Sequence, residues 1–197
     1  MLRVIAGSAK GRKLKLVPGD TTRPIMDRVK EALFSIIGRD VLDASFLDLF
    51  AGTGSVGIEA LSRGAKQAVF IDTEPKAIQT INDNLKITGL AAKASVRRTD
   101  GFIYLSSRVE QPYDFIYIAP PQYKEMWQKA LRLIDAKPTW LTPEGTVIVQ
   151  IDPEEFALLE LQALVLDDER RYGSTLLLFY SLKATELPST APSVASP

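Results

Sequence analysis

The chain has 197 residues, of which 46% are hydrophobic and 24% are charged. These values suit one soluble domain with a sizeable core and a short appendage. Cysteine and histidine are both absent, which excludes disulfides, cysteine nucleophiles, histidine bases and the usual zinc centres. No apolar leader begins the chain, and no run approaches the roughly 18–20 apolar residues of a membrane span. We therefore expect a cytoplasmic protein, and nothing in the sequence requires more than a monomer.

The charges are unevenly distributed, although the formal net charge is zero. Residues 1–30 carry eight basic and two acidic side chains, a net charge of +6, so the rest of the chain carries −6. A basic arm on an acidic body predicts that a polyanion such as a nucleic acid docks at one end of the molecule. The alternative is a solvated N-terminal hairpin without a partner.

The first predicted elements are two short strands and a helix. The strands are expected at residues 2–7 and 12–17, on either side of a turn of glycine, serine and lysine. The helix is predicted from Pro24 to Ile37, because its apolar residues recur at helical period, proline lies in its first turn and Gly38 follows its end.

Strands and helices then alternate along the chain. Strands are predicted at residues 46–50, 68–72, 94–98, 114–118 and 146–151, and helices from a glycine loop to residue 61, over 75–88 and over 124–135. This alternation predicts a doubly wound α/β fold, with a mostly parallel sheet covered by helices on both faces. Two last strands, at 161–166 and 175–182, lie on either side of a charged stretch and Tyr172-Gly173. They predict an antiparallel hairpin that brings the sheet to seven strands.

These patterns divide the chain into three parts. Residues 1–20 are predicted to form a basic β-hairpin extension, and residues 21–183 the main domain. Residues 184–197 (ATELPSTAPSVASP) are small, polar and rich in proline. Such a composition cannot bury enough apolar surface to fold, so we expect a disordered tail.

A glycine loop follows the first strand of the main domain. The segment DLFAGTGSVG, from Asp48 to Gly57, contains G-x-G-x-x-G between a predicted strand and a predicted helix. Its glycines allow a sharp turn and close approach of a ligand, and the helix behind it offers free N–H groups to an anion. Asp72 ends the second strand, 18 residues beyond Gly54, where a carboxylate can accept hydrogen bonds from ribose. A nicotinamide dinucleotide and S-adenosylmethionine (SAM) both fit this pattern.

The acid ahead of the loop separates these two cofactors. Asp48 would repel a pyrophosphate, but it suits a ligand that carries an ammonium and a sulfonium, as SAM does. Asp100, after the third strand, could accept the exocyclic amine of adenine, with Phe102 as an apolar wall. The alternatives without a cofactor are that Asp72 only starts a helix, that Asp100 only forms a turn and that Phe102 belongs to the core. Three acids at three successive strand ends favour the cofactor interpretation over these alternatives.

Several segments resemble one family. The run from Arg23-Pro24 to Phe34 (RPIMDRVKEALF) resembles the R-P-T-x-D-x-V-R-E-A-L-F segment of RsmD-type enzymes, which are SAM-dependent guanine-N2 methyltransferases of small-subunit ribosomal RNA. The glycine loop with its following helix, Asn84-Leu85 and the segment from Tyr172 to Thr175 are also similar to family positions. The resemblance runs from about residue 3 to residue 182.

This resemblance implies a class I SAM-methyltransferase sheet, with SAM as the cofactor and small-subunit rRNA, or a partly assembled small subunit, as the partner. It implies that Asp48, Ala51, Gly52 and Gly54 hold the methionine part, that Asp72 and Thr73 lie at the ribose, and that Asp100, Gly101 and Phe102 lie at the adenine. The rRNA contacts would come from Arg3, Lys10, Arg12, Lys13, Arg23 and Arg28.

The expected catalytic segment departs from the family pattern. RsmD-type enzymes carry Asp/Asn-Pro-Pro-Tyr/Phe after the fourth strand, where polar groups orient the target amine and the aromatic ring stacks on the extruded base. Here the segment reads Ala119-Pro120-Pro121-Gln122-Tyr123. In a first interpretation, Gln122 or the carbonyl of Pro120 receives the amine and Tyr123 stacks. The others are a different substrate, or a binding protein that has kept the fold.

We favour an active enzyme among these interpretations. Methyl transfer from a sulfonium depends mainly on proximity and alignment. The loss of one polar contact therefore costs on the order of 10²-fold in rate, which slows the reaction without abolishing it. A nicotinamide-dependent oxidoreductase is disfavoured by Asp48, by Pro120-Pro121 and by the absence of histidine and cysteine.

Overall fold

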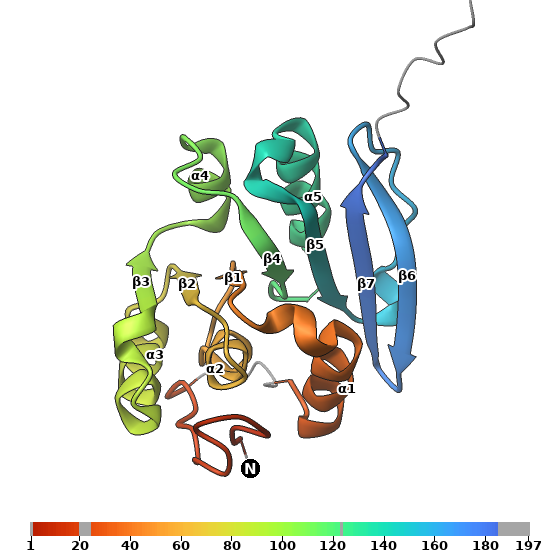
Figure 1. Ribbon diagram of the computed structural model, residues 1–197. Helices are drawn as coiled ribbons and strands as arrows, with labels where there is room; N and C mark the ends of the chain where they lie inside the picture. The colour runs from red at the N-terminus through yellow and green to blue at the C-terminus, as the bar shows by residue number, and fades with distance from the viewer. Residues whose placement is uncertain (1, 20–24, 123, 185–197) are drawn as a thin grey trace, which may run out of the picture.

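The computed structural model describes residues 2–19, 25–122 and 124–184, and it contains one seven-stranded sheet with helices on both faces (Figure 1). The strands are β1 (Ser45–Asp48), β2 (Gln67–Asp72), β3 (Ala94–Arg98), β4 (Tyr113–Ile118), β5 (Leu141–Ile151), β6 (Leu164–Tyr172) and β7 (Thr175–Leu182). The helices are α1 (Asp27–Ile37), α2 (Ser55–Ser62), α3 (Pro75–Thr88), α4 (Gly101–Ser106) and α5 (Met126–Ala136). Short 3₁₀ turns lie at Gly38–Val41, Ala91–Lys93, Pro138–Trp140 and Pro153–Glu155. None of the helices in these ranges is long and apolar enough to cross a membrane.

The strand order is β3-β2-β1-β4-β5-β7-β6, and it confirms the predicted fold class. Strands β1 to β5 are parallel, whereas β7 runs antiparallel to β5 and β6 antiparallel to β7. The chain builds outward from β1 to β3 and then returns to place β4 on the other side of β1. The order therefore reverses between β1 and β4, and the carboxyl ends of these strands form the crevice where such sheets bind ligands.

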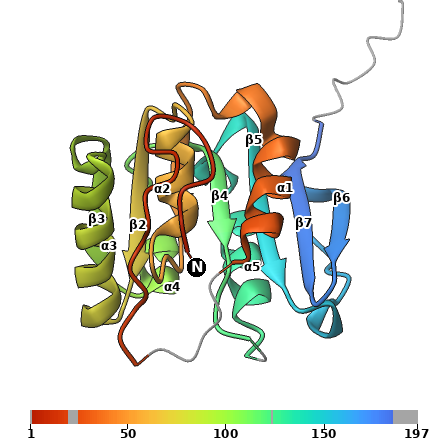
Figure 2. The same cartoon turned by 90° about the horizontal axis from the view of Figure 1, so that it is seen from below.

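Two apolar layers hold the helices against the sheet. Helices α1, α2 and α3 pack on one face, around Phe46, Phe70 and Phe115, while α4 and α5 pack on the other, around Trp127 and Trp140 (Figures 1 and 2). All four residues of β1 are buried, as expected for a central strand that is covered on both faces. This burial fixes the position of the loops that follow the strands.

The N-terminal arm, defined here as residues 2–19, lies across α2 on the outside of the first helical layer (Figure 2). Its two limbs pair antiparallel through a bridge between Arg3 and Lys13. The predicted continuous strands over 2–7 and 12–17 do not form, because part of the arm's backbone bonds to α2 instead of to itself. The amides of Ile5 and Ala6, for example, donate to the Glu59 carboxylate at 2.8 and 3.0 Å.

Several other elements differ from the prediction: α1 begins at Asp27 and β5 at Leu141, and the differences at α4 and β6 are larger. Hydrophobic periodicity did not indicate α4, because this helix has six residues and is defined by its cap: Asp100 accepts from the amides of Phe102 and Ile103. The charged stretch expected to separate the last two strands instead lies within β6, which continues to Tyr172. Since β6 is an edge strand, most of these charged side chains face solvent, and the pairing with β7 continues after a register shift between Leu166 and Asp168. Residues 20–24, with Arg23 and Pro24, and the tail beyond residue 184 lie outside the described residues.

Candidate cofactor and substrate site

The glycine loop joins β1 to α2 at the point where the strand order reverses. Gly52 and Gly54 have φ of 53° and 74°, in the left-handed region that glycine adopts without strain. A Cβ built on Gly52 would meet nothing within 4 Å, so the loop leaves open space in front of its backbone. Gly54 instead packs toward Ile81 of α3, at 3.2 Å from such a Cβ. The loop thus has one face toward the crevice and one toward the core, which fits a ligand held by backbone groups.

Asp72 ties this loop to the end of β2. Its carboxylate accepts from the amide of Gly52 at 2.8 Å and from the amide of Glu74 at 2.9 Å. These two bonds leave lone pairs of the carboxylate free, because an ionised carboxylate has about four acceptor sites. Thr73 follows as an exposed residue, and its carbonyl accepts from Arg98 Nε at 3.2 Å. Asp72 therefore starts the turn into α3 and also lies at the crevice.

Asp100 occupies the equivalent position after β3. One oxygen of its side chain caps α4, with bonds of 2.7 and 3.0 Å to the amides of Phe102 and Ile103. The Phe102 ring makes an edge contact with Phe50, and Lys129 Nζ lies 4.2 Å from its centroid. Gly101, the first residue of α4, is buried. Asp100 therefore caps a helix, whereas the alternative interpretation had it only in a turn.

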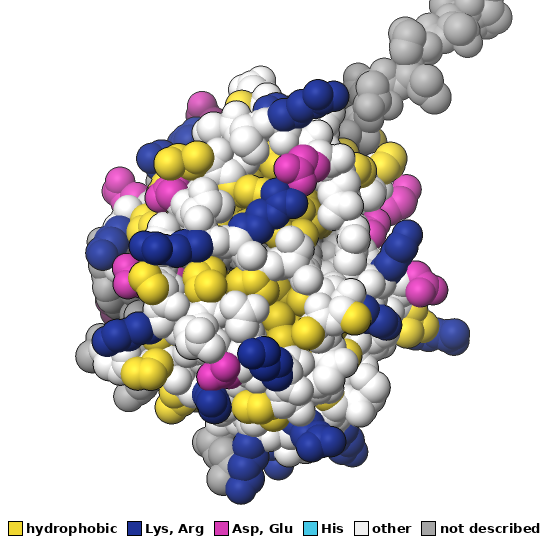
Figure 3. Space-filling model, turned by 90° about the vertical axis from the view of Figure 1, so that its left-hand side faces the viewer, with side chains coloured by type: hydrophobic (Ala, Val, Ile, Leu, Met, Phe, Trp, Pro, Cys, Tyr) yellow, Lys and Arg dark blue, Asp and Glu magenta, His cyan; other side chains and the backbone are white. Residues whose placement is uncertain are grey.

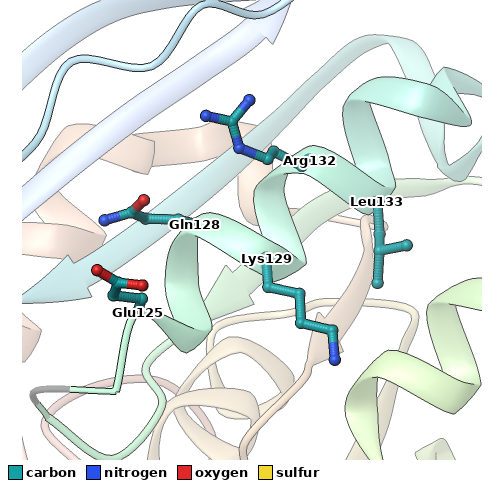
Figure 4. Close-up of a pocket in the computed structure, with 5 residues that line it drawn as sticks. All are labelled: Glu125, Gln128, Lys129, Arg132 and Leu133. Atoms are coloured by element: carbon teal, nitrogen blue, oxygen red, sulfur yellow. The ribbon is translucent and has the colours of Figure 1, made fainter.

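Asp100 and Phe102 also line an open pocket. That pocket lies between α4 and α5 and has a volume of about 680 Å³. A smaller one of about 340 Å³ lies along α5, where Gln128 and Arg132 project on one side and Lys129 on another (Figure 4). Both pockets share Lys129, so a cation borders the predicted adenine position.

Asp48 is placed differently from the other two acids. Its side chain is 1% exposed, beneath the loop, and it accepts from the amide of Gly57 at 3.1 Å. Burial raises the pKa of the Asp48 carboxyl to about 7, since desolvation outweighs the bond from Gly57, and the nearby charge of Asp72 adds to the rise. The same surroundings hold the pKa of the Tyr117 phenol well above its ordinary value. Asp48 therefore lies beneath the loop backbone, and it is the charge of its carboxylate that reaches the crevice.

The predicted catalytic segment leaves β4 at the same edge of the sheet. Ala119 and Pro120 are half-buried, and Ala119 packs against the core layer that contains α1 and α2. Pro121 and Gln122 are exposed. Tyr123 lies outside the described residues. Ala119 contributes no polar atom from its side chain, so Gln122 and the backbone carbonyls are the acceptors in the described part of this segment, residues 119–122.

The predicted RNA-binding cations are spread along the N-terminal arm and α1. Lys10, Arg12, Lys13 and Arg28 are exposed, and the exposed Arg3 pairs with Asp27 at 3.0 Å. Lys and Arg side chains gather at the lower end of the face in Figure 3, the end at which the arm lies in Figure 1. The turn of the arm packs on the carboxyl end of α2, where the amide of Ser8 donates to the Ser62 carbonyl. Lys10 and Arg12 therefore lie toward the end of α2 that is farther from the glycine loop.

Sequence reasoning missed a buried polar network beneath the arm. The side chains of Lys30 and Glu59 are both 0% exposed, with Lys30 Nζ 3.5 Å from Glu59 Oε2. Asn84 is also fully buried. A signal for Glu59 existed, because it stands in the middle of an apolar helix in which all residues are buried, and a buried carboxylate requires partners.

Known proteins resemble this chain over most of its length. A Bacillus subtilis protein, "Putative rRNA methyltransferase YlbH", is 40% identical, covering 91% of this chain and 98% of its own. "Ribosomal RNA small subunit methyltransferase D" of Haemophilus influenzae is 32% identical over 81% and 86% of the two chains. Among solved structures, "Putative methyltransferase yhhF" from Escherichia coli has a TM-score of 0.82 at 30% identity, covering 93% of this chain and 99% of that one.

A more distant structure shares the fold alone. It is an RNA methyltransferase from Salinibacter ruber in complex with S-adenosyl-L-homocysteine, with a TM-score of 0.63 at 18% identity, covering 85% of this chain and 97% of that one.

A parallel sheet of this order, with an antiparallel β7 inserted beside β5 and a glycine loop at the switch point, defines a class I SAM-dependent methyltransferase. The predicted cofactor is therefore SAM, and the open loop face at Gly52 fits it. Within this class, the chain belongs to the RsmD-type family. The family model described as "Conserved hypothetical protein 95" matches residues 2–181.

Proposed function

We propose that this protein methylates the exocyclic N2 of a guanine in small-subunit ribosomal RNA, with SAM as the methyl donor. The observation that carries the proposal is the convergence of the glycine loop, Asp72, Asp100 and Pro120-Pro121 at the carboxyl ends of four neighbouring parallel strands. The names of the relatives from Bacillus subtilis and Haemophilus influenzae support an rRNA substrate. The guanine N2 position rests on the family resemblance. The cytoplasmic location and the monomeric state expected from the sequence belong to the same proposal.

Each strand end has a part in this proposal. The open face of the loop at Gly52 would hold the methionine part, with Asp48 contributing negative charge from below. The Gly52 amide itself donates to Asp72, so the methionine carboxylate would bind to other N–H groups of the loop and of the start of α2. The free lone pairs of Asp72 would accept from the ribose hydroxyls. Asp100 would accept from the adenine amine, beside Phe102 in the 680 Å³ pocket. When bound, SAM supplies an electrophilic methyl group, and the reaction then depends chiefly on alignment of the acceptor.

The substrate contacts would be divided between the segment after β4, at the crevice, and the arm, whose Lys10 and Arg12 lie toward the far end of α2. The Pro120 carbonyl and the exposed Gln122 amide would orient the guanine amine. Pro120 and Pro121 restrict the backbone and offer no competing N–H donor. The exposed cations of the arm would bind phosphates, which adds affinity without sequence preference.

The test is methyl transfer from labelled SAM to small-subunit RNA, or to small ribosomal particles, that lack native methylation. The RNA is then digested to nucleosides. We expect the label in N2-methylguanosine, and much less label with an Asp100→Ala variant because the adenine would lose its acceptor. SAM binding is measured on the same sample. Binding without transfer to either RNA form would reject the proposal.

A second candidate function is RNA binding or ribosome assembly without catalysis. It is favoured by Ala119, which puts a methyl group where the family has a polar side chain. Ala119→Asp and Ala119→Asn separate the two functions in the same assay. Because the wild-type segment keeps two other acceptors, the methyltransferase proposal expects clear wild-type activity and a change of at most about 10²-fold in the variants. Activity that rises from near zero in both variants would favour the binding role.

A further inference from the structure

The carboxamide of Asn84 joins the N-terminal arm to the cofactor loop. Asn84 belongs to α3 and is fully buried. Its Nδ2 donates to the Thr53 carbonyl at 2.9 Å and to the Lys15 carbonyl at 3.1 Å, and its Oδ1 accepts from the Lys15 amide at 2.7 Å. Thr53 is the residue between the two glycines of the loop. One side chain thus holds the second limb of the arm and the loop backbone together.

Lys30 makes a parallel connection for the first limb. Its Nζ donates to the Arg3 carbonyl at 2.6 Å and to Ser55 Oγ at 3.1 Å. Ser55 is the first residue of α2 and follows Gly54 directly. Both limbs of the arm are therefore bonded, through one buried side chain each, to residues on either side of Gly54.

These contacts make the arm and the loop depend on each other. A buried amide or ammonium that loses a partner cannot turn to water, so a shift of either segment leaves polar groups unpaired. The state in which the arm is docked is then also the state in which the loop has its ligand-binding geometry. A ligand that prefers this state stabilises both segments.

We propose that Asn84 and Lys30 are positioning residues that couple the arm to the cofactor loop, so that cofactor and RNA each strengthen the binding of the other. The RNA half of this inference rests on the function proposed above. Thermodynamic linkage requires the two effects to be equal, and couplings of this kind amount to roughly 5- to 150-fold in affinity.

Ser62 provides a matched control. It anchors the same arm, since its Oγ accepts from the Ala9 amide at 2.9 Å and donates to the Ala6 carbonyl at 2.6 Å. It lies at the last turn of α2, roughly 10 Å from the glycine loop by the rise of the helix. Ser62→Ala therefore weakens arm docking without removing a bond to the loop. Asn84→Ala removes the bonds to the arm and also the bond to the loop.

The experiment is hydrogen exchange of the full chain with and without saturating S-adenosyl-L-homocysteine, read on peptides that cover residues 2–15. In the wild type and in Ser62→Ala, we expect the ligand to slow exchange of the arm by at least about fivefold. In Asn84→Ala we expect less than about twofold, because the bonds that link the two segments are gone. Ser55→Ala is a milder change that removes the Lys30 bond to α2, and it should reduce the effect as well. It serves as the test if Asn84→Ala fails to fold, which a melting curve detects.

The coupling would be overturned if the ligand did not slow hydrogen exchange of the arm in the wild type. It would also be overturned if the ligand slowed exchange equally in the wild type, Asn84→Ala and Ser55→Ala. RNA binding is measured in parallel, with and without the same ligand, and should tighten in the wild type when the ligand is present. Ligand-dependent protection of the arm in a protein that binds no RNA would reject the proposed function but leave the arm–loop coupling standing. RNA affinity that is unchanged by the ligand, together with an unprotected arm, would reject the coupling and not the function.

Discussion

At the residue scale, the most unusual group is the Asp48 carboxyl, which is buried and has a pKa raised to about 7. The unfolded value is 3.8, so the folded state holds this proton more tightly than the unfolded state does. Its stabilising contribution is complete below about pH 3.8 and is lost as the pH rises through about 7. The charge that would attract a cationic cofactor therefore develops near neutral pH.

Asp48→Asn should remove this pH dependence. Asparagine keeps the size of the side chain and an acceptor for the Gly57 amide, but it does not titrate. We expect the free energy of unfolding of the variant to increase relative to that of the wild type between about pH 5 and pH 7, by up to about 1.4 kcal/mol per pH unit. Urea unfolding at several pH values across this range measures the difference, in which other titrating groups cancel. A difference that is constant with pH would contradict the raised pKa.

Gly57 is a second residue whose size is limited by a neighbour. A Cβ at this position would lie 2.4 Å from Phe70 Cε1, in a fully buried contact between α2 and β2. Gly57→Ala should destabilise the protein by about 1–3 kcal/mol through overpacking. Helix propensity acts in the opposite direction, by about 1 kcal/mol in favour of alanine. A thermal melt shows whether overpacking or helix propensity has the larger effect. An increase in melting temperature would show that Phe70 moves aside freely.

At the scale of elements, the contact between the arm and α2 depends on Glu59. Its carboxylate accepts from two arm amides and from Arg63 Nε, and it neutralises Lys30. Burial lowers the pKa of Lys30 despite the nearby carboxylate, which shows how costly this ammonium is to desolvate. The buried pair is therefore one polar anchor of this interface, and Ser62 is another.

Glu59→Ala should cost about 3–5 kcal/mol, because it leaves a buried cation without its counter-ion. Arg63→Ala is the control, since Arg63 approaches the same carboxylate from a partly exposed position and should cost about 1 kcal/mol or less as an ion pair. Urea unfolding compares the two. Similar losses for both variants would mean that Lys30 finds another partner or loses its proton at little cost.

The elements also show what the sequence could and could not predict. Helix α3 was predicted at its observed bounds, because Pro75 at its start and Gly89 in the left-handed region after its end are local signals. Helix α4 was not predicted, because its sequence signal is one capping carboxylate, and a carboxylate at this position also fits a turn. The acids at the strand ends could be predicted because parallel strands end at one edge. The bonds of Asn84 could not, since its partners are 69 and 31 residues away and only the tertiary fold brings them together.

At the scale of the whole molecule, charge is separated between a +6 segment and a −6 remainder. The arm carries exposed Lys10, Arg12 and Lys13 on the side of the sheet that holds α1, α2 and α3. A polyanion would be attracted to this side and repelled by acidic surfaces elsewhere. Such attraction is screened by salt, which gives it a measurable signature.

Replacing Lys10, Arg12 and Lys13 with alanine should weaken RNA binding and flatten its salt dependence. For each phosphate that the variant no longer neutralises, the slope of log K against log salt concentration should become shallower by about 0.7–0.9. The charge-matched control replaces the exposed Arg170 and Arg171 of β6 and Lys183, which directly follows β7. Binding measured between about 50 and 200 mM salt gives both slopes. An equal reduction in the control would show that net charge, and not the arm, drives association.

The long separation between the arm and its anchors also has a consequence for synthesis of the chain. Lys15 is bonded to Asn84, 69 residues later. At about 5–20 residues per second, a ribosome makes Asn84 roughly 3 to 14 seconds after Lys15. During that interval the second limb of the arm has no α3 to dock on. The second limb of the arm therefore takes its final place only after α3 has been made.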